Sequence, residues 1–465
     1  MARSPSAHAL RWVSCLPFAV RERDRFRLVA LAAHTAPLPI APRAPALSIP
    51  ATGPHAHKAI ARPLPFPTTT GLAPQLVLAG IATSVAISFN ILLPVVPVLM
   101  ERRGPHGAAG AATAALFVGA VAGEVLTPWL MSRWSSTRLL VVGQLMTAVP
   151  SLVYVLPHPD AWLMLVAAAA RGLGMGVAIV VAVALVGEFA APDRRGRSMG
   201  YFGFALTAPG VVVPSAAVAL LGAGHADADA LIAFVIGLAG AFLVIKLQHP
   251  APSPLAASAN PLAAFRRPGL LSLYLAFVLV SCSFGAVITF APVVLPASGL
   301  GSAAAFLFIA GAARAASRWF AGILGDRGTG RLLLLGSIGV TFVGLVALAS
   351  HLNSLVVIFA AAAFGAGYGA VQTAIYLAMV ARGSSDHRNN ISALWNSGID
   401  LGASLGGTLI GLAASRYGYG AAIWAFPAVV LISLPLVLLP GRAMDQSEPS
   451  GGAQKTTSTS SSSIS

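Results

Sequence analysis

Long apolar runs alternate with short polar connections along most of this chain. Twelve of these runs have the roughly 17–25 residues that an α-helix needs to cross the hydrocarbon core of a bilayer. The pattern predicts an all-α membrane protein with twelve transmembrane helices, at 73–99, 108–130, 139–156, 162–187, 199–221, 230–247, 270–295, 303–324, 332–349, 355–380, 391–413 and 420–439.

The composition of the 465 residues agrees with membrane helices and excludes a soluble multidomain protein. Hydrophobic residues make up 57% of the chain and charged residues 9%, whereas an average soluble domain is about 25% charged. The 47 glycines and 33 prolines mostly stand inside apolar runs, where membrane helices tolerate them better than soluble helices do. Two cysteines, Cys15 and Cys282, are too few for a disulfide framework or a cysteine-based zinc site.

The net charge of +15 indicates membrane orientation rather than nucleic-acid binding, because most of it lies in an N-terminal tail and in short loops. With the N-terminus in the cytoplasm, the cytoplasmic loops hold twelve Lys and Arg residues and the outside loops hold three. This bias predicts a multi-pass protein of the plasma (cytoplasmic, or inner) membrane with both termini in the cytoplasm. We expect a monomer in the lipid bilayer.

Composition shifts divide the chain into five segments. The first seventy residues are basic, rich in Pro and Ala and without a sustained period, so we expect a disordered tail; translated sequence upstream of the true start and an organellar transit peptide remain alternatives. The last residues are rich in Ser and Thr and cannot pack a core. The predicted organisation is a tail at 1–70, a six-helix bundle at 71–247, a cytoplasmic linker at 248–268, a second six-helix bundle at 269–440 and a tail at 441–465.

The two halves of the chain repeat one another. The segment 167–176, four alanines followed by three spaced glycines, returns as 360–369 at an offset of 193 residues. Leu130 and Arg133 return as Leu324 and Arg327 at an offset of 194. Because each half has an even number of spans, the repeats keep the same topology and are related by an axis along the membrane normal.

The connection between the eighth and ninth spans carries the most specific local pattern. Gly322 is followed by Asp326, Arg327 and Arg331, and Arg318 stands four residues before the glycine. Together with the twelve spans and the duplication, this loop makes the chain resemble the major facilitator superfamily over nearly all of 71–440. The resemblance implies that these five residues belong to a cytoplasmic gate and that the fold is the twelve-helix fold of that superfamily.

Ionisable residues inside membrane spans are costly and indicate function. Glu124, Arg171, Arg314 and Asp400 are the candidates for substrate binding or coupling. Arg314 and Asp400 both lie roughly 14–15 Å from the cytoplasmic ends of their helices at about 1.5 Å per residue, so we expect them to pair. If protons drive transport, Glu124 or Asp400 must carry them, because all ten histidines lie in tails or loops.

Polar side chains within the spans mark the expected wall of a central substrate cavity. They are Asn90, Thr207, Gln372, Tyr376, Trp395 and Asn396.

These features predict a secondary active transporter of a small organic molecule that works by alternating access. Efflux by proton antiport is the first interpretation, because the expected cavity is rich in apolar and small residues. Uptake of an organic anion or another metabolite by proton symport, with the anion held by Arg171 or Arg314, is the alternative. The chain has no Walker sequence, paired catalytic carboxylates or metal-ligand spacing, so we expect no enzyme activity, no cofactor and no metal. A non-transporting sensor on the same scaffold remains a third interpretation.

Overall fold

The computed structural model describes residues 72–189, 195–247, 265, 269–325, 330–351, 353–382 and 388–438. The chain divides into two units, Met1–Phe66 and Pro67–Ser465, and every described residue lies in the second. The described residues are almost all helical and form no strand, so the all-α prediction is confirmed.

The predicted spans of the first half appear as eight α-helices and one 3-10 helix, because three spans are broken near prolines. The first span breaks at Pro94, the third at Pro150 and the fifth before Pro209, and each proline lacks the N–H that would continue the helical hydrogen bonds. The elements are α1 (Leu72–Leu92), α2 (Val95–Arg103), α3 (Ala108–Met131), α4 (Ser136–Ala148), η1 (Val149–Val155), α5 (Ala161–Phe189), α6 (Arg195–Thr207), α7 (Pro209–Gly222) and α8 (Ala226–Val244).

The second half has one helix for each predicted span. Its α13 continues through a kink at Gly418, whose φ of 75° suits glycine. The helices are α9 (Leu270–Val294), α10 (Ala303–Gly325), α11 (Gly330–Ser350), α12 (Ser354–Arg382), α13 (Arg388–Ala422) and α14 (Ala425–Leu438).

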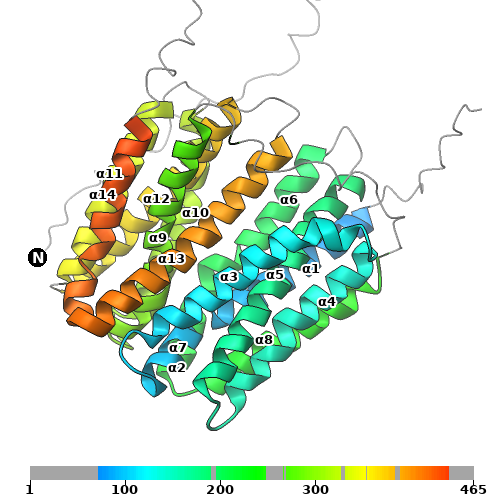
Figure 1. The fold of residues 1–465 in the computed structure, drawn as a ribbon, viewed down its shortest axis with the longest axis horizontal. Coiled ribbons are helices and arrows are strands. Elements are labelled where there is room, and N and C mark those ends of the chain that lie inside the picture. Colours follow the sequence, from blue (N-terminus) through cyan, green and yellow to red (C-terminus); the bar gives the residue numbers. More distant parts are fainter. Residues whose placement is uncertain are drawn as a thin grey trace, which may run out of the picture. The chain divides into compact units, whose positions relative to one another are not determined.

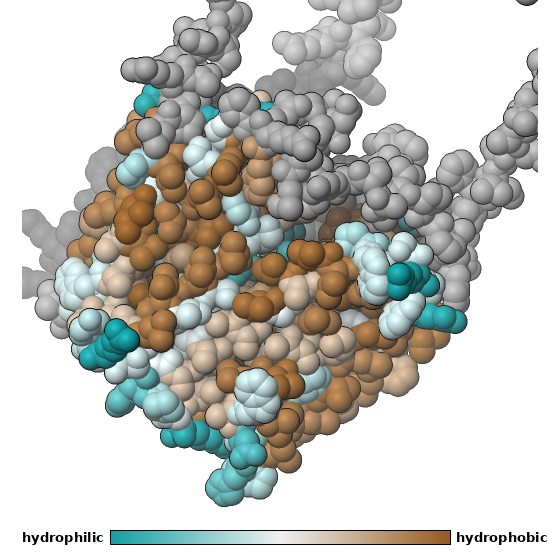
Figure 2. Space-filling model, in the orientation of Figure 1, coloured by the Kyte–Doolittle hydropathy of each residue, from teal (hydrophilic) through white to brown (hydrophobic). Residues whose placement is uncertain are grey.

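Ten helical segments of the described chain are long and apolar enough to cross a membrane. The two other predicted spans are α10, which holds Arg314 and Arg318, and α14, which has 14 residues. Both pack within the second bundle. Apolar side chains cover much of the face shown in Figure 2, and hydrophilic side chains gather toward its margins, as expected for a surface that faces lipid.

The two halves use the same helix packing, as the duplication predicts. In the first half α5 packs closely on α3, and in the second half α12 packs closely on α10 (Figure 1). A Cβ on Gly176 would clash with the backbone carbonyl of Ala120, and a Cβ on Gly369 would clash with that of Arg314. The glycines are 193 residues apart and their partners 194, so Arg314 takes the place in α10 that Ala120 takes in α3.

The halves meet most extensively along two helix pairs, α3 with α13 (Figure 1) and α7 with α10, and also where α2 and α3 contact α9. Along the first pair, Gly110 packs against Gly407 so closely that a Cβ on either glycine would be crowded. Along the second, the Ser215 hydroxyl donates to the Ala304 carbonyl at 2.8 Å. These contacts lie in the first half of α3 and of α10 and in the second half of α13, which are the ends nearest the connections with few arginines.

Candidate transport site

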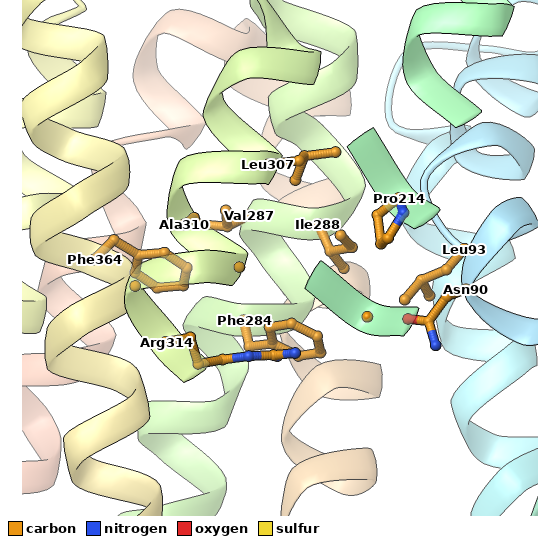
Figure 3. A pocket seen from close by; sticks show the side chains of 13 residues that line it. Asn90, Leu93, Pro214, Phe284, Val287, Ile288, Leu307, Ala310, Arg314 and Phe364 are labelled. Atoms are coloured by element: carbon orange, nitrogen blue, oxygen red, sulfur yellow. The ribbon is translucent and has the colours of Figure 1, made fainter. Parts of the chain in front are cut away.

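An open cavity, with about 470 Å³ of empty space when the part open to the outside is counted, lies between the two halves. Figure 3 shows it from close by, with Asn90 and Pro214 of the first half on one side and Arg314 and Phe364 of the second half on the other. Apolar side chains make most of its wall. They are Leu93, Pro214, Phe284, Val287, Ile288, Leu307, Ala310 and Phe364.

Arg314 provides the positive charge of this cavity. Its guanidinium carbon lies 5.2 Å from the centre of the Phe284 ring, within the range of a cation–π contact. A Cβ placed on Gly210 would lie 3.5 Å from Nη2 of Arg314 and 3.7 Å from Oδ1 of Asn90. Polar groups from the two halves therefore converge on the space beside Gly210.

A column of three stacked aromatic rings lies beside Arg314. The rings of Phe284 and Tyr368 are stacked at 5.4 Å and 7°, and those of Phe364 and Tyr368 at 5.8 Å and 2°. Tyr368 is fully buried and its hydroxyl donates to the Ser281 hydroxyl at 3.3 Å. Sequence reasoning missed these three aromatic residues, although Phe364 and Tyr368 stand beside the spaced glycines of the repeat.

Arg318 lies one helical turn from Arg314 on α10 and has an aromatic partner of its own. Its guanidinium carbon is 5.4 Å from the centre of the Trp395 ring on α13. The Trp395 indole donates from Nε1 to the Gln372 carbonyl at 2.9 Å, and its ring stacks on Phe277 at 5.9 Å and 18°. Arg318 is half-buried and, unlike Arg314, is not among the residues that line the first cavity.

Glu124 and Asp400 bring two carboxyl groups of opposite halves near one another. The Asp400 carboxylate is close enough to interact electrostatically with the Glu124 carboxyl group. Asp400 stands four residues before Ser404 and seven before Gly407 on the stripe of α13 that contacts α3. Glu124 shares a face of α3 with Thr113, which contacts α9.

The expected pair of Arg314 and Asp400 is not formed in this structure. No carboxylate of the described residues lies within 4.0 Å of the Arg314 guanidinium. The sequence places the two residues at the same expected depth, but Arg314 points at Phe284 of α9, whereas Asp400 stands on the α3-facing stripe of α13. Equal depth did not determine the direction in which each side chain leaves its helix.

Arg171 lies inside the first half, away from the cavity lining. It is 1% exposed and donates from Nη2 to the Ser88 carbonyl at 2.5 Å and from Nε to the Thr147 carbonyl at 3.2 Å. These bonds tie α5 to α1 and α4. The geometry fits a residue that holds three helices together.

The predicted gate residues are only partly visible. Asp326 and Arg327 lie outside the described residues. Gly322 is half-buried with open space where a Cβ would stand, and Arg331 is exposed at the start of α11. Arg318, expected at the same gate, lies over the ring of Trp395.

The expected cavity residues occupy different places. Asn90 lines the cavity. Thr207 is exposed and bonds to the Gly203 carbonyl within its own helix. Gln372, Tyr376 and Trp395 cluster beside Arg318, since the ring of Tyr376 meets Trp395 edge-on at 5.9 Å. Asn396 is half-buried next to that cluster in the chain.

A second open cavity, with about 640 Å³ of empty space when the part open to the outside is counted, lies beyond the first along the same helices. Val218 and Pro292 line it and stand four residues after Pro214 and Ile288 of the first cavity. About one helical turn, or 6 Å, therefore separates the two spaces. At its rim Glu101 accepts hydrogen bonds from backbone N–H groups at the start of α3.

Comparison with known proteins places this arrangement in a family. The model of the Major Facilitator Superfamily matches residues 78–393 and 320–464. No curated protein sequence matches the chain at the required significance.

Solved transporter structures share the fold. A mutant of the nucleoside transporter NupG aligns with a TM-score of 0.66 at 13% identity, over 80% of this chain and 99% of that one. A bacterial homologue of the human lysosomal transporter Spinster, in an inward-facing and unoccupied conformation, aligns with a TM-score of 0.64 at 15% identity, over 82% and 98%. A mutant of the peptide transporter POT in complex with alafosfalin aligns with a TM-score of 0.61 at 15% identity, over 79% and 95%. With its two six-helix halves around a shared cavity and a family match over most of its length, the chain belongs to the Major Facilitator Superfamily of transporters.

Proposed function

We propose that this protein is a proton-coupled symporter that takes up a small organic anion by alternating access. The observation that carries the proposal is Arg314, a cation in the cavity between the halves with no carboxylate within ion-pair distance among the described residues. An uncompensated cation in a membrane interior is costly, and an anionic substrate would compensate it. Asn90 from the other half would hold a polar group of the same substrate.

The wall of the cavity supports a substrate that is also partly apolar. Phe284, Phe364 and the aliphatic side chains of Leu93, Ile288 and Leu307 surround Arg314. Ligand sites of this kind use apolar surface for affinity and a few polar groups for orientation. A carboxylate with an aliphatic or aromatic body fits both features.

The balance of charge favours symport over antiport for such a substrate. Arg314 and Arg318 contribute two positive charges near the boundary, and Glu124 and Asp400 contribute two negative charges when ionised. When no substrate is bound, these four residues together are then neutral. Each negative charge that the substrate brings needs one proton on a carboxyl group to keep the site neutral. Movement of the anion and the proton together therefore avoids an uncompensated buried charge.

The proposed setting is the plasma membrane with both termini in the cytoplasm, because the arginine-rich connections indicate that orientation. The cavity is built from residues of a single chain, so a monomer suffices for transport.

Efflux of an amphipathic compound by proton antiport is the second candidate. The apolar majority of the cavity wall favours it, because such walls accept varied hydrophobic bodies. In this case Arg314 would restrict the range of compounds rather than define it.

The test is transport into proteoliposomes that hold the purified protein. Uptake of labelled carboxylates, with benzoate and butyrate as first probes, is measured with and without a pH gradient that is acidic outside. We expect stimulation by the gradient in the wild-type protein and at least about a tenfold loss of uptake in Arg314→Gln. The matched control is Arg416→Gln, which removes an exposed arginine at the end of α13. Uptake that is stimulated when the vesicle interior is acidic, and only for cationic or neutral amphipathic compounds, would favour antiport.

A further inference from the structure

We propose that Arg318 and Trp395 form a second anion subsite, so that the substrate carries two anionic groups about one helical turn apart. This inference rests on the proposed function, because it names the substrate class of the same site. A dicarboxylate with four or five carbons has the required chemistry and spacing.

The two arginines form a short ladder along one face of α10. Arg314 and Arg318 are four residues apart, so their Cα atoms are displaced by about 6 Å along the axis and lie on nearly the same side of the helix. Each guanidinium lies over an aromatic ring of a different neighbouring helix, at 5.2 Å for Phe284 of α9 and 5.4 Å for Trp395 of α13. Arg314 lines the first cavity, and Arg318 lies one helical turn beyond that lining.

Neither arginine is compensated by the part of the protein that the structure describes. No described carboxylate lies within 4.0 Å of either guanidinium, and neither donates a hydrogen bond to a described residue. Arg314 and Arg318 are close enough for their positive charges to interact, and Tyr368 lies near both. A monoanion would pair with one arginine and leave the other without an anionic partner, whereas a dianion would pair with both, with protons on Glu124 and Asp400 keeping the four residues and the substrate neutral together.

The surroundings of Arg318 hold its aromatic partner in place. Trp395 is fixed by the hydrogen bond from its indole to the Gln372 carbonyl, by stacking on Phe277 and by the edge of Tyr376. A ring that is held on three sides loses little conformational freedom when a ligand binds beside it. A binding subsite needs an aromatic partner that is held in place in this way. An arginine whose only role is to extend to the membrane surface does not need one.

The first half has no equivalent ladder. At the offset of 194 residues, Ala120 and Glu124 occupy the positions of Arg314 and Arg318. The repeat itself therefore does not require arginine at either position. The pair belongs to the second half alone, so one half supplies the cations that hold the substrate and the other supplies a carboxyl group at the level of Arg318.

The experiment measures binding of glutarate and butyrate to the purified full-length protein in detergent by calorimetry. These ligands have similar carbon chains but carry two and one carboxylates. We expect wild-type protein to bind glutarate about tenfold or more tightly than butyrate. Arg318→Gln should reduce this preference to about twofold or less while butyrate binding stays within about twofold of wild type, and Arg318→Lys should restore part of it. Malonate, with its carboxylates too close to reach both arginines, should bind no better than butyrate.

The same measurements separate the two proposals. Loss of butyrate binding in Arg314→Gln reports the proposed anion site, whereas the ratio of glutarate to butyrate affinity reports the second subsite. An Arg318→Gln protein that keeps the wild-type ratio, or that loses both ligands equally, would overturn the second subsite and leave the first intact. Binding of neither ligand to the wild-type protein would overturn both. Arg416→Gln should leave every affinity unchanged.

Discussion

The hydroxyl oxygens of Thr113 and Thr289 lie 2.7 Å apart across the boundary between the two six-helix halves. Thr113 belongs to α3 and Thr289 to α9, and both residues are buried. Close packing of Gly110 on Gly407 lies one turn away. Together these contacts join the halves at the end with few arginines, so the alternating access proposed above requires that they separate once in each cycle.

A disulfide between these positions should therefore arrest transport. In a protein with Cys15→Ser and Cys282→Ser, the pair Thr113→Cys and Thr289→Cys is close enough for a disulfide, because hydroxyl oxygens at 2.7 Å imply Cβ atoms within about 5 Å. Oxidation should abolish uptake into proteoliposomes, and a reductant should restore it. Thr113→Cys alone is the control. Full uptake by the oxidised pair would show that this end does not open.

The glycine crossing gives a second test of the same boundary. A Cβ on Gly110 would clash with the carbonyl oxygen of Gly407, and overpacking of this kind costs about 1–3 kcal/mol. Gly110→Ala should therefore destabilise the closed form and raise the labelling rate of a cysteine introduced at the buried Ser404. Gly339→Ala, where nothing lies within 4 Å of the added Cβ, is the matched control. Unchanged labelling in Gly110→Ala would contradict a rigid crossing.

The spans and the repeat could be predicted from the sequence because both depend on one-dimensional patterns. Apolar length predicts which segments cross the bilayer, and the duplicated alanine and glycine segment predicts that α5 and α12 pack alike. The contacts of Gly176 and Gly369 in the structure agree with that prediction. The breaks near Pro94 and Pro209 followed from chemistry that the hydropathy pattern does not contain.

The site was harder to predict because a side chain needs a direction as well as a depth. Depth suggested a pair of Arg314 and Asp400, yet their helices turn these residues toward different neighbours. The duplication held unused information. The offset that relates Leu130 to Leu324 also relates Glu124 to Arg318, and it would have placed these two charges at one level in opposite halves.

Arg171 and Arg314 should respond oppositely to the same substitution. Arg171→Gln removes bonds to the carbonyls of Ser88 and Thr147 in a fully buried site, and unsatisfied buried groups cost about 1–3 kcal/mol each. It should lower the melting temperature and leave butyrate affinity nearly unchanged. Arg314→Gln removes a charge that the described protein does not compensate, so stability should stay the same or rise while anion binding is lost. Thermal unfolding and calorimetry on the same samples decide this, and a loss of binding without loss of stability in Arg171→Gln would place Arg171 in the substrate site.

Asp400 gives the test of proton coupling. The charge of Asp400 acts on Glu124 across the boundary, and symport requires that a carboxyl group in this region gain a proton with the substrate and release it afterwards. Asn at position 400 resembles the protonated side chain permanently. Asp400→Asn should therefore still exchange labelled for unlabelled substrate across the membrane, but it should lose accumulation driven by a pH gradient. For the wild-type protein, accumulation should rise as the external pH falls, because the proton enters from outside with the anion. Asp229→Asn removes a buried carboxyl group of α8 that does not line the first cavity and should keep the wild-type pH dependence. Accumulation in Asp400→Asn that follows pH as in the wild type would exclude Asp400 from coupling, and the same measurement on Glu124→Gln would then show whether its neighbour carries the proton instead.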